Sequence, residues 1–170
     1  MHRPSELPAH VRALAIVLLV LGALGLMSAP VGVLGIALAK GSSMGRVMKD
    51  PVLLGWIFGS TVLGALLSVA QLLGAIGLLS RQRWARSVLN AESLVALVTG
   101  VVGVVVNVAV VVPRVSALAS TDPYALPSSG PSQAVLGALS GVLGNLAGLA
   151  VAVATLVILS RPEVSRALTR

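Results

Sequence analysis

The residues of this sequence that could do chemistry lie inside long apolar stretches. Glu92 is the only acidic residue within them, and amide side chains lie at Gln71, Asn107 and Asn145. A polar or ionisable group inside a membrane is costly, and by default it indicates a pathway for a proton, an ion or a substrate. These residues therefore give a first hypothesis, a channel or transporter for protons or small polar solutes.

Glu92 also has a structural explanation. It follows Arg86 by six residues, about 9 Å along a helix that rises 1.5 Å per residue, so its carboxylate could reach interfacial water or an arginine. On a helix, Glu92, Thr99 and Asn107 share one face, which we expect to turn toward neighbouring helices. A structural pair is favoured over a conducted proton, because Glu92 lies close to the end of its apolar stretch.

The amides have two explanations as well. Gln71 and Asn145 fall near the middle of their stretches, where a facing pair could coordinate a polar solute or could bond to each other and fix how two helices pack. Interhelical hydrogen bonds of this kind contribute only about 0.6 kcal/mol on average. Contact between helices therefore explains the amides without a solute, and it is the favoured explanation.

The remaining residue types predict no catalytic, cofactor-binding or metal site. Cysteine is absent, and His2 and His10 lie in the polar N-terminal segment at a spacing that does not suit a metal. No strand precedes Gly22 and Gly25, so a nucleotide-binding fingerprint is not expected. With no His, Cys, Asp or Lys inside an apolar stretch, we predict that the protein is not an enzyme and uses no cofactor.

The elements that carry these residues follow from composition. Hydrophobic residues make up 56% of the 170 residues and charged residues 10%, and the mean hydropathy of +1.01 lies outside the range of soluble domains. Stretches longer than the ~20 residues that cross a bilayer lie at 13–39, 51–80, 88–112 and 132–160. Because they are continuous, they predict helices and not a barrel. We predict an all-α polytopic membrane protein, one domain over residues 1–170 with four transmembrane helices in one bundle.

Boundary signals accompany these stretches. Asp50 followed by Pro51 predicts an N-cap and a proline at the first helical position. The segment 114–131 is rich in Ser and Pro and is predicted as the longest loop. A cleaved signal peptide is not expected, because the first apolar run continues well past Ala29.

A basic segment separates the second and third stretches. Arg81, Arg83, Trp84 and Arg86 lie within the sequence SRQRWARS at 80–87. Guanidinium groups must end in water or among lipid headgroups, and Trp is favoured at that depth. These residues are predicted to be the interfacial anchors of a membrane hairpin. The basic segments could also hold anionic headgroups, although a role in topology explains them equally well and is favoured.

Positive residues are divided unequally between the two predicted sides. The side of the termini and the hairpin turn holds eight: Arg3, Arg12, Arg81, Arg83, Arg86, Arg161, Arg166 and Arg170. The other side holds four: Lys40, Arg46, Lys49 and Arg114. Positively charged segments stay in the cytoplasm, so we predict a multi-pass protein of the cell inner (plasma) membrane with both termini cytoplasmic. The net charge of +7 then needs no nucleic acid as a partner.

Small residues form a stripe on the fourth stretch. Gly137, Gly141, Gly144 and Gly148 follow a 4-3-4 spacing, which predicts a face for close helix packing because helices in lipid gain no hydrophobic advantage from associating. Packing within the chain is the more economical interpretation, and packing between copies is the alternative. The expected partners are membrane lipid and either a second copy or another membrane protein.

Two segments carry a family resemblance. ALAIVLLVLGALGLMSAP at 13–30 and GAIGLLSRQRWARSVL at 74–89 resemble a loose group of small bacterial four-span membrane proteins. That group has a Gly-rich first helix and a second helix that ends in a basic turn containing Trp-Ala-Arg. The resemblance covers about half the chain, and it implies a four-helix membrane fold without any particular activity.

The favoured function is a non-enzymatic integral membrane protein, a small structural or accessory subunit. The alternative is a small-solute or proton transporter or channel that uses Glu92, Gln71 and Asn145. The two hypotheses differ in one structural expectation. A transporter would line one continuous polar cavity with these side chains, whereas an accessory subunit would hold each of them separately in a packed core.

Overall fold

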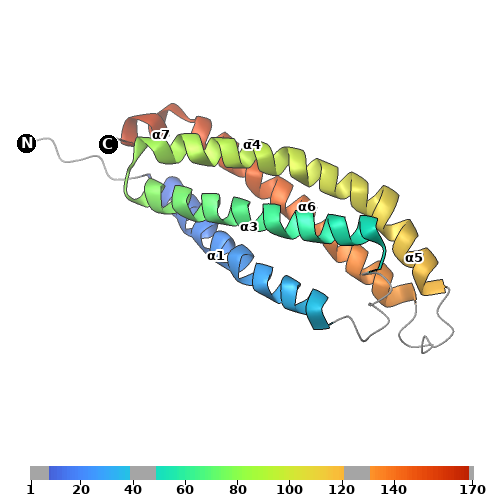
Figure 1. The fold of residues 1–170 in the computed structure, drawn as a ribbon. Coiled ribbons are helices and arrows are strands. Elements are labelled where there is room, and N and C mark those ends of the chain that lie inside the picture. Colours follow the sequence, from blue (N-terminus) through green and yellow to red (C-terminus); the bar gives the residue numbers. More distant parts are fainter. Residues whose placement is uncertain (1–7, 39–48, 121–130, 169–170) are drawn as a thin grey trace, which may run out of the picture.

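The computed structural model describes residues 8–38, 49–120 and 131–168. These ranges form α1 (Ala9–Leu38), α3 (Pro51–Leu79), α4 (Arg83–Val106), η2 (Asn107–Val111), α5 (Val112–Ser120), α6 (Pro131–Ser160) and α7 (Pro162–Ala167). The π-helical turns of η2 join α4 and α5 into one long rod (Figure 1). No strand occurs in the described ranges, and the all-α prediction is confirmed.

Within the described ranges, four helical segments are long and apolar enough to cross a membrane: Ala9–Ser28, Pro51–Leu79, Arg83–Leu118 and Leu139–Ser160. Each corresponds to one of the apolar stretches in the sequence. The four-helix membrane fold is therefore confirmed.

Helix boundaries differ from the predicted ones in the second half of the chain. The predicted loop from Arg114 is wrong as far as Ser120, because α5 continues the helix through those residues. Pro113 has no N–H, and its ring displaces the carbonyl of Ala109 four residues earlier. Ala109 lies in η2, where the wider π turn removes the regular helical bonding that Pro113 would break. The proline is thus accommodated without ending the rod.

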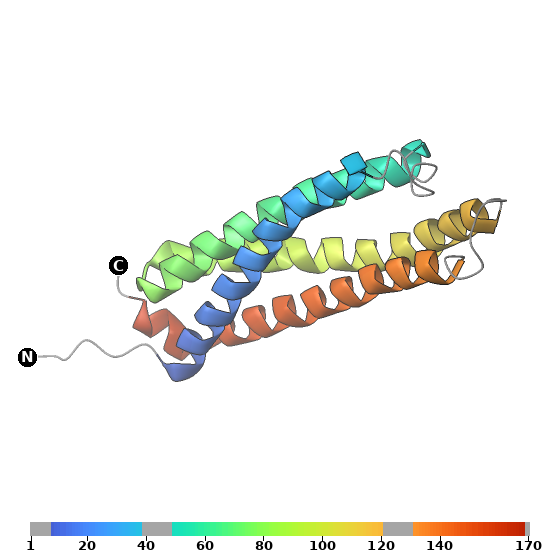
Figure 2. The ribbon, with the colours of Figure 1, turned by 90° about the horizontal axis from the view of Figure 1, so that it is seen from below.

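The helices pack as consecutive antiparallel pairs. α3 lies against both α1 and α4, and α6 lies against α4 and α5, whereas α1 and α6 touch only slightly. The start of α1, the α3–α4 turn and α7 lie at one end of the molecule (Figure 1), and we call this the terminal end. The opposite end, where Asp50 and Arg114 lie, is the loop end. In Figure 2 the α1–α3 and α4–α6 pairs diverge from the terminal end toward the loop end.

The core is concentrated at the terminal end. It is a cluster of buried apolar side chains from five helices and the residue after α7: Val11, Leu14, Ala15, Leu18, Ala75, Leu78, Ala85, Leu89, Leu159, Val164 and Leu168. Elsewhere large apolar side chains face outward, among them Met27 at 71% exposure and Leu143 at 67%. An outward apolar surface of this extent fits lipid as the surrounding solvent.

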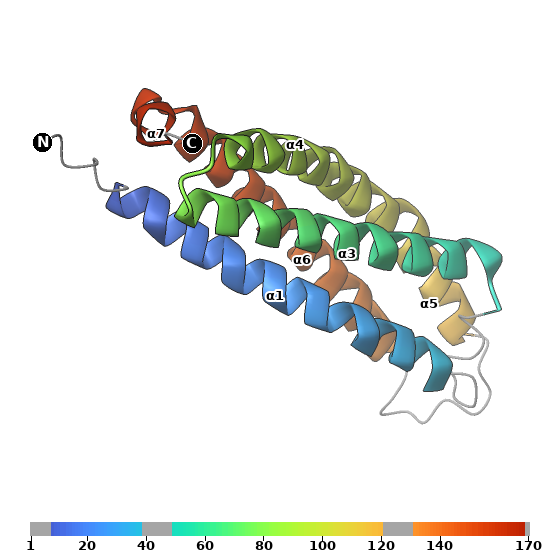
Figure 3. The same ribbon diagram turned by 60° about the vertical axis from the view of Figure 1, so that its left-hand side comes forward.

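A short helix that the sequence analysis did not anticipate closes this core. The segment after α6 entered the sequence analysis only through its positive residues, yet α7 begins with Pro162 at its first turn and folds back across the terminal end (Figure 3). Val164 and the following Leu168 are 0% and 4% exposed. Their spacing of four residues puts both on one helical face, and that spacing is the signal by which the helix could have been found.

The α3–α4 turn is tight and contains one strained residue. The N–H of Gln82 donates to the Gly77 carbonyl at 2.8 Å, and the N–H of Arg81 donates to the Leu78 carbonyl at 3.0 Å. These two bonds are those of a Schellman motif, which places a left-handed residue, usually glycine, just after the helix. Here that residue is Arg81, with φ at 58°. A side chain in this conformation costs about 1–2 kcal/mol.

Candidate functional site

The amides of Asn107 and Asn145 lie in a reciprocal arrangement between α4 and α6. Asn107 Nδ2 donates to the Gly103 carbonyl at 2.7 Å, and Asn145 Nδ2 donates to the Gly141 carbonyl at 2.9 Å. A Cβ added to Gly103 would lie 2.6 Å from Asn145 Oδ1, and one added to Gly141 would lie 3.3 Å from Asn107 Oδ1. Each glycine thus accepts a bond from its own helix and leaves room for the amide of the other. We call these four residues the double Asn–Gly contact.

The double Asn–Gly contact is packed on both sides of the interface. Asn107 is 9% exposed and Asn145 is half-buried. The contact continues toward the terminal end, where Leu149 would lie 2.9 Å from a Cβ added to Gly100. Small residues that allow close backbone approach are what stabilises helix pairs in lipid. The arrangement is therefore a packing contact with its amide donors satisfied.

Gln71 does not take part. A Gln71–Asn145 pair, which the sequence left open, does not form, because Asn145 lies against Gly103 of α4 while α3 packs on α1 and α4. The neighbours of Gln71 face α1 instead, where Ser68 and Leu72 lie against Gly22 and Gly25. The structure brings Asn107 to Asn145 and leaves Gln71, half-buried, on another interface.

Glu92 is half-buried on α4 and accepts a hydrogen bond from Ser93 Oγ at 3.3 Å. In the described part of the chain it makes no ion pair, so the expected pair with an arginine of the hairpin turn is not present. The physical reason is that α4 already begins at Arg83. Arg86 and Glu92 then lie on one helix six residues apart, which points them to different faces.

The face of α4 on which Glu92 was expected to lie does turn toward neighbouring helices. Gly103 and Asn107 are buried there against α6. Thr99 is half-buried and donates to the Val95 carbonyl at 2.8 Å. Glu92, Thr99 and Asn107 therefore each bond within their own helix, and the structure gives no contact that joins them.

Only part of the glycine stripe of α6 packs against another helix of the described chain. Gly141 lies against Asn107, but a Cβ added to Gly144 or Gly148 would meet nothing within 4 Å. Packing within the chain is therefore wrong for Gly144 and Gly148, while Gly137 lies in a part of α6 whose surroundings fall outside the described residues. The residues of α6 that contact α4 are Gly141, Asn145 and Leu149, the last two of which directly follow Gly144 and Gly148 in the sequence.

The predicted interfacial anchors gather at the terminal end. Arg83 and Trp84 are exposed, with Trp84 at 48%, and Arg81 and Arg86 are half-buried. The inner edge of the Trp84 ring lies over Gly77, 2.9 Å from where a Cβ would stand. The indole is thus held at the end of the hairpin with its outer part free, which suits a position at headgroup depth.

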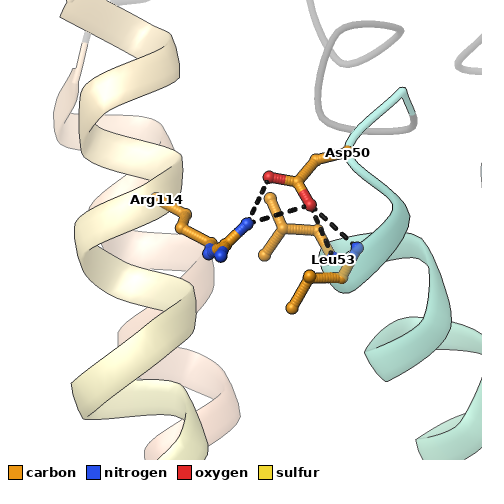
Figure 4. A network of polar contacts seen from close by, with 4 residues as sticks. Asp50, Leu53 and Arg114 are labelled. Atoms are coloured by element: carbon orange, nitrogen blue, oxygen red, sulfur yellow. Dashed lines mark hydrogen bonds and ion pairs between the residues drawn. The ribbon is translucent and has the colours of Figure 1, made fainter.

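An ion pair joins two helices at the loop end. Asp50 caps α3 as predicted, accepting bonds from the N–H groups of Val52 and Leu53 at 2.8 and 3.3 Å. Arg114 of α5 reaches the same carboxylate at 2.9 Å (Figure 4). Partial desolvation raises the pKa of Asp50, but the two backbone N–H groups and the Arg114 guanidinium outweigh it and bring that pKa below its ordinary value. The carboxylate therefore stays ionised.

Nothing in the described residues forms a metal site. No group of three or more His, Asp or Glu side chains comes together there. His10 lies in the first turn of α1, and its Nε2 is buried without a hydrogen-bond partner in the described part of the chain. His2 lies outside the described residues.

Comparison of the chain with protein-family models, with curated proteins and with solved structures finds no match. The resemblance to small bacterial four-span membrane proteins therefore stays a prediction. The assignment to a membrane depends on the helices of this chain. Their length and apolar composition, together with the outward-facing apolar surface, make the chain a multi-pass membrane protein of four helices.

Proposed function

We propose that the chain is a non-enzymatic structural or accessory subunit that works through helix packing with another membrane protein. The observation that carries the proposal is that Glu92 and Gln71 lie apart from the contact of Asn107 and Asn145. Asn107 and Asn145 are held by glycine carbonyls of their own helices, Glu92 bonds to its neighbour Ser93, and Gln71 lies on a different interface. Polar side chains used in this way fix helix contacts and do not line a path.

Open backbone surface on two helices supports the same proposal. Gly144 and Gly148 on α6 have no atom within 4 Å of an added Cβ, and the same holds for Gly55, Gly59 and Gly64 on α3. Association in lipid depends on close packing of helices, which such positions allow. A helix of another protein could therefore approach α6 at Gly144 and Gly148 without displacing anything in this chain.

The proposed placement is the inner membrane of a bacterial cell, with the terminal end in the cytoplasm. Arg12, Arg81, Arg83, Arg86 and Arg161 lie at that end and form no ion pair within the described residues. At the loop end the positive charges among the described residues are those of Lys49 and Arg114, and Arg114 is paired with Asp50. This distribution supports retention of the terminal end in the cytoplasm.

Cross-linking from the open face of α6 tests the proposal. The chain has no cysteine, so Gly148→Cys introduces a single reactive thiol. In native membranes we expect a homobifunctional thiol cross-linker to give one discrete adduct containing a different protein. Ala91→Cys, at an exposed position of α4, is the matched control and should give no such adduct.

A second pair of variants tests whether packing at that face matters. Gly144→Leu combined with Gly148→Leu should fold normally, because both positions are open, but should no longer co-purify with the partner identified by cross-linking. Ala91→Leu should keep it. Equal recovery of that partner with all variants would contradict the proposal.

Two observations favour the alternative, a proton or small-solute transporter. Glu92 is a half-buried carboxylate with no ion-pair partner in the described chain, and the π-helical turn at Asn107 lies beside Asn145, a kind of irregularity that often marks functional sites. In liposomes, proton or solute flux that is lost in Glu92→Gln and kept in Glu163→Gln would establish transport. That result would refute the accessory-subunit proposal.

A further inference from the structure

Arginines from four segments of the chain come together at the terminal end. We call these five residues the terminal arginine cluster: Arg12, Arg81, Arg83, Arg86 and Arg161. Their place follows from the core, because Val11, Leu78, Ala85 and Leu159 belong to one cluster of contacts and each lies within three residues of an arginine. Five guanidinium groups therefore share one end of a narrow bundle.

Within the described residues, no acidic side chain pairs with the terminal arginine cluster. None of its members forms an ion pair in the part of the chain that the structure describes, and the acidic residue described at this end, Glu163, is exposed and unpaired as well. The loop end differs, since Arg114 is held by Asp50 at 2.9 Å. The terminal end is thus left with a concentrated positive charge that faces outward.

Arg81 occupies a position that favours glycine. Its φ of 58° is in the left-handed region, where any side chain is strained, and this is the site of the Schellman motif that glycine usually fills. The sequence contains 18 glycines, and two of them, Gly74 and Gly77, lie in the last turns of α3 before this position. A strained residue of this kind indicates a role for its side chain that lies outside the fold itself.

The first turn of α4 also lacks the acidic residues that helix N-termini favour. It contains Arg83 and Arg86 and no acidic residue, and the N-cap Gln82 makes no side-chain bond to it. The start of a helix carries a partial positive charge, which acidic groups stabilise and basic groups destabilise. A negative charge from outside the chain would relieve the repulsion at this turn and among the arginines.

We propose that the terminal arginine cluster binds the phosphate-bearing headgroups of anionic phospholipids, with Arg81, Arg83 and Arg86 as the principal contacts. Guanidinium groups bind phosphate oxygens in a bidentate manner. Trp84, exposed at 48% beside Arg83, lies at the same end of the hairpin, and indole side chains are favoured at headgroup depth. The lipid thus supplies a negative charge to arginines that have no ion-pair partner among the described residues.

Thermal unfolding of the purified protein in a neutral detergent tests this proposal. We expect added phosphatidylglycerol to raise the unfolding temperature in a saturable way. Phosphatidylcholine with the same acyl chains should not, and neither should soluble glycerol phosphate. Stabilisation by both lipids alike, by neither, or by glycerol phosphate alone would each overturn the proposal, the last because the ligand would then be free phosphate.

Arg81→Gly separates binding from folding. Glycine removes the strain at φ 58°, so in neutral detergent this variant should unfold at the wild-type temperature or above it. Its apparent affinity for phosphatidylglycerol should nevertheless fall about fivefold, the effect expected for one arginine near a charged lipid surface. Loss of response in a variant that is no less stable cannot be ascribed to misfolding.

Two further variants complete the comparison. Arg83→Gln combined with Arg86→Gln should weaken the response about 25-fold, with two arginines removed. Lys49→Gln removes a positive charge at the loop end, where Lys49 is exposed, and should respond as the wild type does. If Arg81→Gly, the double variant and Lys49→Gln all respond alike, the lipid is not recognised by this cluster.

Discussion

At Gly103, the amide of Asn145 occupies the volume that a side chain would need. The distances from an added Cβ to all three outer atoms of that amide are between 2.6 and 2.9 Å. The amide cannot withdraw without giving up its bond to the Gly141 carbonyl. One methyl group at this position therefore disturbs both helices of the double Asn–Gly contact.

Gly103→Ala should consequently destabilise the protein by about 1–3 kcal/mol, the usual cost of overpacking. Gly144→Ala should be neutral or slightly stabilising, because its Cβ would meet nothing and alanine is the better helix former. Unfolding by SDS in mixed micelles measures both. Combining Gly103→Ala with Asn145→Ala should recover part of the loss, since the clash is removed, and strict additivity of the two changes would speak against the contact as described.

The sequence could not predict these contacts fully, because the role of each glycine depends on which residue of the facing helix lies opposite it. Asn107 was correctly expected on a face turned inward, whereas in the glycine stripe of α6 Gly141 lies against Asn107 and Gly144 and Gly148 are open. The sequence alone does not tell which of two adjacent rows meets α4, because Gly141 belongs to both and a step of one residue turns the helix by about 100°. The row through Asn145 packs, and the row through Gly148 stays open.

At the scale of single elements, α3 shows how a local signal fixes a boundary. Asp50 and Pro51 start the helix as predicted, with the carboxylate accepting two backbone N–H groups. The ion pair with Arg114 adds a third partner. Because these contacts lower the pKa of Asp50 below its ordinary value of 3.8, they favour the ionised form, and the cap depends on pH.

The contribution of Asp50 to the free energy of unfolding should decrease as the pH is lowered. A carboxyl group with a lowered pKa in the folded state contributes stability that is fully present above its unfolded pKa and is lost as pH falls through the folded value. We expect unfolding temperatures measured from pH 6 to pH 3 to fall more steeply in the wild type than in Asp50→Asn, which can cap but cannot titrate. Parallel curves for the two proteins would show that Asp50 does not contribute in this way.

Element existence was easier to predict than element ends. The four spans follow from hydropathy, since a bilayer admits little else for runs of this length. The end of the third span was harder, because the chain stays helical through Pro113 as far as Ser120, with the π turn in η2 accommodating the proline. α7 was missed because its six residues lie in a basic segment, and the four-residue spacing of Val164 and Leu168 was not used as a helix signal.

At the scale of the whole molecule, two helix pairs are joined at both ends by different means. The terminal end has the tight α3–α4 turn and the core, whereas the loop end has the Asp50–Arg114 ion pair between α3 and α5. The order of neighbours, α1 with α3 and α4 with α6, agrees with short connections between antiparallel helices. The ion pair was not predictable, because its partners lie 64 residues apart in the chain.

Arg114→Gln should therefore loosen the loop end alone. Spin labels at Phe58→Cys and Val108→Cys, both exposed, report the separation of α3 and η2, and their distance distribution should broaden in the variant. Labels at Ile76→Cys and Val157→Cys, also exposed and close to the terminal end, should show no change. Equal broadening of both pairs, measured by pulsed dipolar spectroscopy, would mean that the ion pair does not act locally.

The consecutive pairing of helices also bears on biosynthesis. Each helix packs on the one made just before it, so α1 with α3, and then α4 with α6, can assemble in the order in which the ribosome delivers them. The core is an exception, because Val164 and Leu168 enter it last. A nascent chain halted before α7 would lack Val164 and Leu168 in this core, and membrane proteases could recognise the unfinished product by the incomplete core.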